Sequence, residues 1–195
     1  MLDDIARVDG AEVTVECNPE DASGALFAAW RRAGVTRVSF GVQSMVPAVL
    51  SELTRRHTPA DVGAAVALAR EACFETFSVD LIYGPRGESL DDWRRTVEAV
   101  LALDPPHVSA YGLTVEPGTA LWRAPARWPD DDDQASKYLL ADELLSDAGL
   151  SRYEVSNWAR PGHECRHNRL YWAQGDYRGI GCAAHSHVAG RRWWN

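Results

Sequence analysis

The chain has 195 residues, of which 46% are hydrophobic and 25% charged, and its net charge is −8 at neutral pH. This composition is typical of a globular protein, and the negative charge disfavours nucleic acid as a partner, because binding phosphates calls for a basic surface. The sequence has no apolar run long enough to cross a membrane, and its acidic start, Met1 to Asp4, does not resemble a signal peptide. We therefore expect a cytoplasmic protein with no nucleic-acid partner and no transmembrane segment.

Short apolar runs alternate with helical patterns along most of the chain. The strand runs are rich in β-branched and aromatic residues, and the helices begin at capping sequences and end near glycine or proline. In chain order we predict a strand at 12–17, a helix at 21–33, a strand at 36–42, a helix after Thr58, a strand at 77–83, a helix from Ser89, a strand at 107–114, a helix at about 133–148 and a strand at 152–158.

This succession of strands and helices predicts an α/β fold with a parallel sheet. Helices should cover the outside of the sheet, and its strands should be nearly apolar throughout. A complete β/α barrel needs about 250 residues, so the sequence predicts a partial, TIM-like barrel. Proline and an acidic run interrupt the pattern at 122–133. We therefore predict a barrel domain at 1–122 and the start of a small α+β accessory region at 123–195.

Polar residues stand at the carboxyl ends of the four predicted barrel strands. They are Glu16, Gln43, Asp80 and Thr114. In parallel α/β folds the carboxyl edge of the sheet is where ligands bind, and a buried Asp requires a partner. Any one of these residues could instead be a helix cap or an ordinary strand-end polar group. Together they indicate a site for a polar ligand that carries hydroxyl and amino groups.

The four cysteines are widely separated. Cys17, Cys73, Cys165 and Cys182 include no pair within three residues of one another. Such spacing in a cytosolic protein favours free thiols, and it predicts no metal site in this chain.

Longer segments carry a family resemblance. The chain resembles the oxygen-independent coproporphyrinogen III oxidase-like family of radical S-adenosylmethionine (SAM) proteins, and in particular its haem chaperone branch. The matching segments are EVTVECNP (12–19), AGVTRVSFGVQS (33–44), VDLIYG (79–84), HVSAYGLTVEPGT (107–119), YEVSNWARP (153–161), CRHNRLYW (165–172) and GDYRGIGCAAH (175–185).

The resemblance implies a radical SAM-type barrel with SAM bound across its mouth. The SAM-contacting positions of the family fall on Glu16, Gln43, Arg55, Asp80, Thr114 and His185. Carboxylates suit the ammonium and ribose hydroxyls of SAM, and Arg55 suits its carboxylate.

The sequence departs from the family at the cluster motif. Members carry C-x-x-x-C-x-x-C, whose thiolates hold a [4Fe–4S] cluster, and a GGGTP turn near SAM, and neither is present here. We expect the first βα units, which hold the cluster ligands, to lie before Met1. The family's GLPGQT loop also reads GPRGES at 84–89.

The segment His167 to Trp172 resembles the haem chaperone branch specifically. His167 could supply an axial ligand to haem iron, with Asn168 beside it, and Tyr171 and Trp172 could supply a stacking surface. His163 and Cys165 are alternative donors, and an ordinary loop histidine next to core aromatic residues is the simpler alternative.

Three functions remain open. The first is a haem chaperone that binds haem, SAM and, in full-length form, a [4Fe–4S] cluster, and delivers haem to a haem-accepting protein. The second is an oxygen-independent coproporphyrinogen III oxidase in porphyrin biosynthesis. The third is an inactive barrel fragment, in keeping with the absent cluster cysteines. In all three cases we expect that this chain alone does not cleave SAM.

Overall fold

A computed structural model of the protein describes residues 8–195. Its main sheet contains four parallel strands in chain order, and two short strands extend it with antiparallel pairing. The strand order is β1 (Thr14–Cys17), β2 (Arg37–Gln43), β3 (Thr76–Tyr83), β4 (His107–Gly112), β6 (Asn157–Ala159) and β5 (Ser151–Arg152). The predicted strands at 12–17, 36–42, 77–83 and 107–114 are therefore confirmed.

Most of the helices begin at a residue whose side chain caps them. The helices that precede residue 150 are α1 (Gly24–Arg32), α2 (Pro47–Glu52), α3 (Pro59–Glu71), α4 (Leu90–Leu101) and α5 (Asp131–Asp147), with short 3₁₀ turns at Pro19–Asp21 and Pro125–Arg127. Thr58 with Asp61 and Ser89 with Asp92 form complete capping boxes at α3 and α4. These boxes confirm two of the predicted helix starts, whereas α2 was not predicted.

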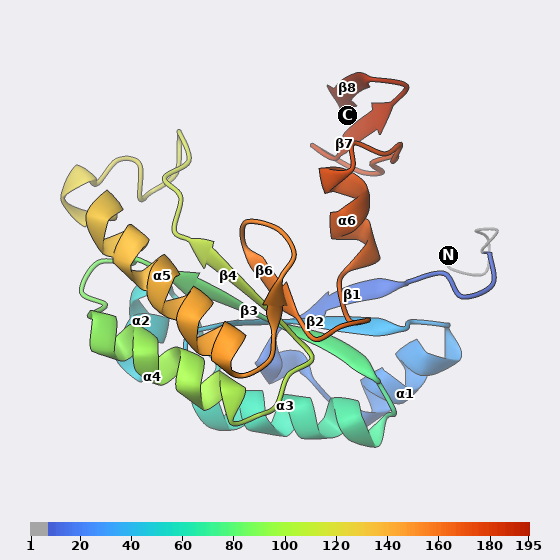
Figure 1. The fold of residues 1–195 in the computed structure, drawn as a ribbon, viewed down its shortest axis with the longest axis horizontal. Coiled ribbons are helices and arrows are strands. Elements are labelled where there is room, and N and C mark those ends of the chain that lie inside the picture. The colour runs from blue at the N-terminus through green and yellow to red at the C-terminus, as the bar shows by residue number, and fades with distance from the viewer. Residues whose placement is uncertain (1–7) are drawn as a thin grey trace.

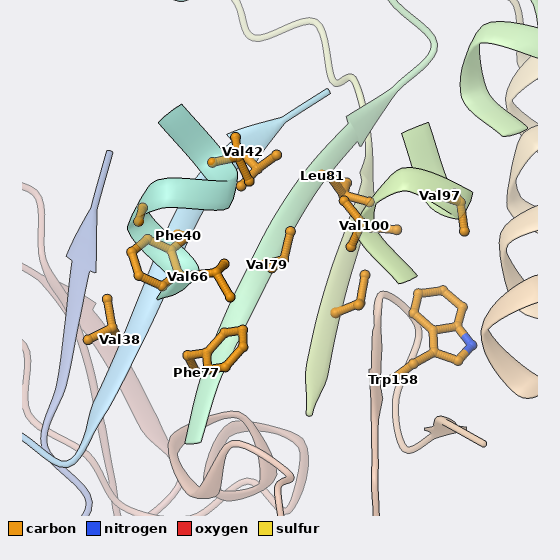
Figure 2. Packing of buried hydrophobic residues seen from close by; sticks show 14 of the residues in the cluster. Val38, Phe40, Val42, Val66, Phe77, Val79, Leu81, Val97, Val100 and Trp158 are labelled. Atoms are coloured by element: carbon orange, nitrogen blue, oxygen red, sulfur yellow. The ribbon is translucent and has the colours of Figure 1, made fainter. Parts of the chain in front are cut away.

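One face of the sheet packs against the helices and forms the hydrophobic core. Figure 2 shows the strand residues of this face, such as Val38, Phe40, Val79 and Leu81, packed beside Val66 and other helix residues. Burial of a large apolar side chain contributes about 1.5–3 kcal/mol, so this layer dominates the stability of the fold. Figure 1 shows α1, α3 and α4 on this side of the sheet.

The other face of the sheet is polar, so the expectation of nearly apolar strands is wrong. Along β2, β3 and β4 the residues that alternate with the core are polar: Arg37 and Ser39, Thr76, Ser78 and Asp80, and His107, Ser109 and Tyr111. Successive side chains of a strand point to opposite faces. Helices α1, α3 and α4 cover the core face, so the opposite face is free to line a cavity.

The predicted strand at 152–158 is replaced by a turn between β5 and β6. The backbone N–H of Tyr153 donates to the carbonyl of Asn157 at 3.1 Å, and the side chain of Asn157 donates to that of Glu154. Val155 at the tip is exposed. The apolar residues of this segment therefore do not share one strand, which periodicity alone does not reveal.

A helix and a hairpin rise from the polar face. Helix α6 (Arg166–Trp172) is followed by the hairpin of β7 (His185–Val188) and β8 (Arg191–Trp194). Figure 1 shows both on the side of the sheet opposite α3 and α4. The Glu12 carboxylate accepts hydrogen bonds from the backbone N–H groups of Arg166 (3.1 Å) and His167 (3.4 Å). Glu12 thereby caps α6 from a segment more than 150 residues earlier.

The core continues past residue 122. Leu140, Ala141 and Leu145 of α5 and Trp158 of β6 belong to the same hydrophobic cluster as β2 and β3. The predicted division at residue 122, into a barrel domain and an accessory region, stays a prediction. Across residues 8–195, no helix has both the length and the apolar character needed to cross a membrane.

Candidate functional site

The polar face of the sheet holds two adjoining cavities. We call the first the carboxyl-end cavity, with a volume of about 590 Å³, lined by Glu16, Cys17, Asn18, Ser39, Gly41, Gln43, Arg55, Asp80, Ile82, Tyr111, Gly112, Leu113 and Thr114. The second is the amino-end cavity, with a volume of about 450 Å³, lined by Glu12, Thr14, Glu16, Arg37, Ser39, Ser78, Asp80, His107, Ser109, Tyr111, Asn157, Cys165, His167 and Asn168. Their shared wall consists of Glu16, Ser39, Asp80 and Tyr111.

Five of the six residues predicted to contact SAM line the carboxyl-end cavity. They are Glu16, Gln43, Arg55, Asp80 and Thr114. The parallel pairing of β1, β2, β3 and β4 explains this gathering, because the carboxyl ends of parallel strands meet at one edge. The polar strand-end residues therefore do converge on one cavity.

Local backbone geometry places Gln43 and Arg55. The register of β2 against β3 shifts between Phe40 and Gln43, and Gln43 has a left-handed backbone with φ of 65°. Arg55 follows α2, and its Nη1 donates to Oδ1 of Asn18 at 3.2 Å. Gly41 also lines the cavity, where an added Cβ would lie 3.2 Å from the Gln43 amide nitrogen and 3.5 Å from Oδ1 of Asn18. The bulge and this glycine leave room for the two long side chains.

Asp80 stands at the centre of a hydroxyl network in the shared wall. Ser39 Oγ donates to Asp80 Oδ2 at 2.5 Å and lies 2.7 Å from Ser78 Oγ. Burial raises the pKa of Asp80, while hydrogen bonds from Ser39 and Ser109 act in the opposite direction. Loss of hydration therefore disfavours the charged form of Asp80, and positive charge nearby, such as that of Arg37, favours it.

The structure does not bring His185 to the carboxyl-end cavity. His185 is exposed at the start of β7, where its ring lies 6.1 Å from that of Trp194. Its predicted place near SAM rested on sequence similarity, and the hairpin rises away from the carboxyl ends of the strands (Figure 1).

Two of the four residues of the predicted haem segment border the amino-end cavity, and the other two lie outside it. His167 and Asn168 border the amino-end cavity from α6. Tyr171 lies outside it and stacks on Tyr177 at a centroid distance of 4.0 Å, and the exposed Trp172 borders a separate surface hollow near Tyr153. The segment is a helix, whereas the simpler alternative treats His167 as a loop residue, and His167 and Trp172, five residues apart, point to different sides of this helix.

The sequence reasoning missed the residues that build the amino-end cavity. Arg37, Ser78, His107, Ser109 and Asn157 all line it, and all are buried. For the four residues on β2, β3 and β4, the signal in the sequence is the alternation of polar and apolar residues within each strand. Attention to strand ends alone overlooked it. Asn157 lies in β6 and has no such signal.

We expect His107 to make the stability of the fold depend on pH. Burial, and then the positive charge of Arg37, lower the pKa of His107 to about 2. The pKa is lower in the folded state, so the contribution is complete above the unfolded value of about 6.5 and is lost as the pH falls. Between about pH 7.5 and pH 5 the folded chain should lose about 2 kcal/mol through this residue.

Urea unfolding of the natural chain and of a His107→Gln variant at these two pH values measures the effect. Asp80 and Glu88, whose pKa values burial raises, act in the opposite direction in both proteins and cancel in the comparison. An equal loss of stability in the two proteins would contradict the prediction.

The cysteines do not form a cluster site. Cys17 is buried, and burial raises the pKa of its thiol to about 11, while Cys73 and Cys182 are exposed and Cys165 lies beside Glu12. Within the part of the chain that the structure describes, no three His, Cys, Asp or Glu side chains gather so as to hold a metal ion. These residues therefore do not fit a [4Fe–4S] cluster.

Comparison with known proteins gives a family match and a set of similar sequences. The family model of the radical SAM superfamily matches residues 2–100. The heme chaperone HemW of Mycobacterium tuberculosis strain H37Rv is 50% identical over 202 residues, which cover 100% of this chain and 51% of that protein. HemW of Escherichia coli K12 is 40% identical over 178 residues, which cover 91% of this chain and 47% of that protein.

A solved structure supports the fold. The coproporphyrinogen III oxidase HemN from Escherichia coli, described as a radical SAM enzyme, aligns with a TM-score of 0.77 and 22% identity, over 91% of this chain and 44% of HemN. The predicted partial radical SAM-type fold is thus confirmed. The chain spans about half the length of the curated relatives it matches.

Proposed function

Because the chain belongs to the radical SAM superfamily, we propose that its carboxyl-end cavity binds SAM and that the protein acts in the cytoplasm as a haem chaperone. The observation that carries the SAM site is the convergence of Glu16, Gln43, Arg55, Asp80 and Thr114 on that cavity. When bound, SAM would be the cofactor from which members of this superfamily form a radical. Residues 1–122 would provide this site, and residues 123–195 would provide the accessory region.

The charges around the carboxyl-end cavity suit the parts of SAM. The Arg55 guanidinium suits the carboxylate of the methionine moiety, because such pairs form strong, directional hydrogen bonds. Glu16 and Asp80 suit the ammonium group and the ribose hydroxyls. A cation next to Asp80 would also oppose the effect of burial, which raises the pKa of that carboxyl group.

The haem role is supported by two observations. The relatives that cover the whole chain or nearly all of it are named heme chaperone HemW. His167 is exposed in the first turn of α6 and borders the amino-end cavity. Its imidazole is therefore accessible to a ligand that enters from solvent. We propose His167 as the axial donor with Asn168 beside it, and delivery of the haem to a haem-accepting protein. Tyr171 and Trp172 would offer aromatic surface outside the cavity.

Two substitutions should separate the two ligands, because, of these two cavities, Arg55 lines the carboxyl-end cavity alone and His167 lines the amino-end cavity alone. Arg55→Gln should weaken SAM binding at least about tenfold by removing a charge-assisted hydrogen bond, and leave haem binding unchanged. His167→Ala should weaken haem binding and alter the Soret band, and leave SAM binding unchanged. Calorimetry with SAM and absorbance titration with haem measure these effects in the complete chain.

His185→Ala is the matched control, since this histidine lies in the β7–β8 hairpin outside both cavities. It should change neither affinity. A Soret band and haem affinity that are the same with and without the His167 imidazole would remove His167 from the proposal. If Arg55→Gln leaves the affinity for SAM unchanged, the proposal that SAM binds in the carboxyl-end cavity is refuted.

A further inference from the structure

The amino-end cavity contains two buried nitrogen atoms without a hydrogen-bond partner. Arg37 is 2% exposed; its Nη1 donates to the carbonyl of His163 at 2.9 Å, but within residues 8–195 its Nη2 has no partner. His107 is 1% exposed, and its Nδ1 likewise has none among the described residues. Buried polar groups are nearly always paired, so two such atoms in one cavity wall point to a partner that binds there.

The hydrogen bonds of Tyr153 determine which ring nitrogen of His107 carries the proton. The Tyr153 hydroxyl oxygen accepts from the backbone N–H of Cys165 (3.3 Å) and from the amide of Asn168 (3.4 Å). Its own proton is therefore donated to Nε2 of His107, which lies 2.8 Å away. A neutral imidazole that accepts at Nε2 has its proton on Nδ1. The unpartnered Nδ1 of His107 is thus a donor, like Nη2 of Arg37.

No acidic residue of the amino-end cavity forms an ion pair with Arg37. The acidic residues that line the cavity are Glu12, Glu16 and Asp80. Glu12 accepts from the backbone N–H groups of α6, and Asp80 accepts from Ser39. None of the ion pairs found between residues 8 and 195 includes Arg37. The wall of the amino-end cavity therefore contains a buried guanidinium and a buried imidazole, each with one N–H group that has no partner among the described residues.

We infer that the amino-end cavity binds a carboxylate group, which Arg37 and the Nδ1–H of His107 hold as donors. A guanidinium matches the two oxygens of a carboxylate in geometry and charge. Two sources can supply this group. One is a propionate of haem, and this assignment rests on the proposed haem function, because His167 borders the same cavity. The other is a small organic acid that binds independently of haem.

The test uses the complete chain and three probes: haem, the dimethyl ester of haem, whose propionates are uncharged, and succinate. Haem and its ester are titrated by absorbance, and succinate by calorimetry. The variants are Arg37→Gln, Arg37→Lys, which keeps the charge, and Arg70→Gln as a control. Arg70 is an exposed arginine of α3 that does not border the cavity. Circular dichroism checks that each variant folds.

If a propionate is the ligand, the ester should bind at least about tenfold more weakly than haem, and Arg37→Gln should weaken haem but not ester. If a small acid is the ligand, succinate should bind the natural chain and lose affinity on Arg37→Gln, while haem and ester bind alike or not at all. In both cases Arg37→Lys should retain part of the affinity, and Arg70→Gln should have no effect.

Equal binding of haem and ester together with no binding of succinate would overturn the carboxylate site while leaving the haem function intact. Absence of haem binding would refute the haem function, and the succinate measurement would then decide the carboxylate site alone. The comparison of haem with its ester, and the succinate titration, use the natural chain, so a variant that fails to fold does not remove the test.

Discussion

Replacing Lys137 with methionine is expected to lower the free energy of unfolding by about 3–5 kcal/mol, because it leaves a buried carboxylate without its cation. Lys137 in α5 has no exposed surface, and its Nζ donates to the carbonyl of Glu88 at 2.7 Å and to Asp133 at 2.6 Å. The Glu88 carboxylate lies 3.3 Å from the same Nζ and is also buried. This group joins the loop before α4 to α5.

Urea unfolding of the Lys137→Met variant measures the loss. The double variant Lys137→Met with Glu88→Gln should recover part of the stability, because it removes the uncompensated charge. Arg94→Met is the matched control, since Arg94 forms an ion pair with Glu98 on the surface of α4, where such pairs contribute about 0–1 kcal/mol. A Lys137 variant no less stable than the Arg94 variant would show that the buried pair does not stabilise the fold.

Truncation of Trp158 to alanine should cost about 3–5 kcal/mol, through lost apolar burial and the cavity left behind. Trp158 in β6 is fully buried, packs beside Tyr138 at a centroid distance of 5.9 Å, and donates from Nε1 to Asp142 at 2.8 Å. The residue therefore connects β6, at the antiparallel end of the sheet, to α5. The segment that leads to α6 follows β6 directly, so Trp158 also holds the start of that segment in place.

Trp194→Ala provides the comparison for this prediction. Trp194 in β8 is 71% exposed, so its truncation should change the stability of the core by no more than about 0.5 kcal/mol. The two unfolding midpoints in urea give the difference directly. Similar losses for the two tryptophans would mean that β6 does not contribute to the cooperative unit.

The local features of the fold could be predicted from the sequence. The parallel strands are marked by apolar runs that one core buries, and α3 and α4 by capping boxes whose partners lie three residues apart. The residues that make up each of these signals are close together in the sequence, so the signals can be recognised without knowledge of the tertiary structure. The same applies to Glu16 and Asp80, because the ends of parallel strands must meet at one edge.

Features that depend on distant contacts could not be predicted. Helix α6 is only seven residues long, and its amino end is capped by Glu12 rather than by a neighbour in the sequence. His185 was placed near SAM by similarity, but the hairpin that carries it stands apart from the carboxyl-end cavity. The turn at 153–157 depends on an Asn157 contact that no periodicity encodes.

The wall that separates the two cavities has a thermodynamic consequence. Asp80 and its donor Ser39 face both of them, so an occupant on one side sets the protonation and hydrogen bonding that an occupant on the other side meets. Any factor by which the first occupant alters the affinity of the second must equal the factor by which the second alters the affinity of the first. Because the Asp80 carboxyl group belongs to both cavities, ligand binding in the carboxyl-end cavity and ligand binding in the amino-end cavity are linked equilibria.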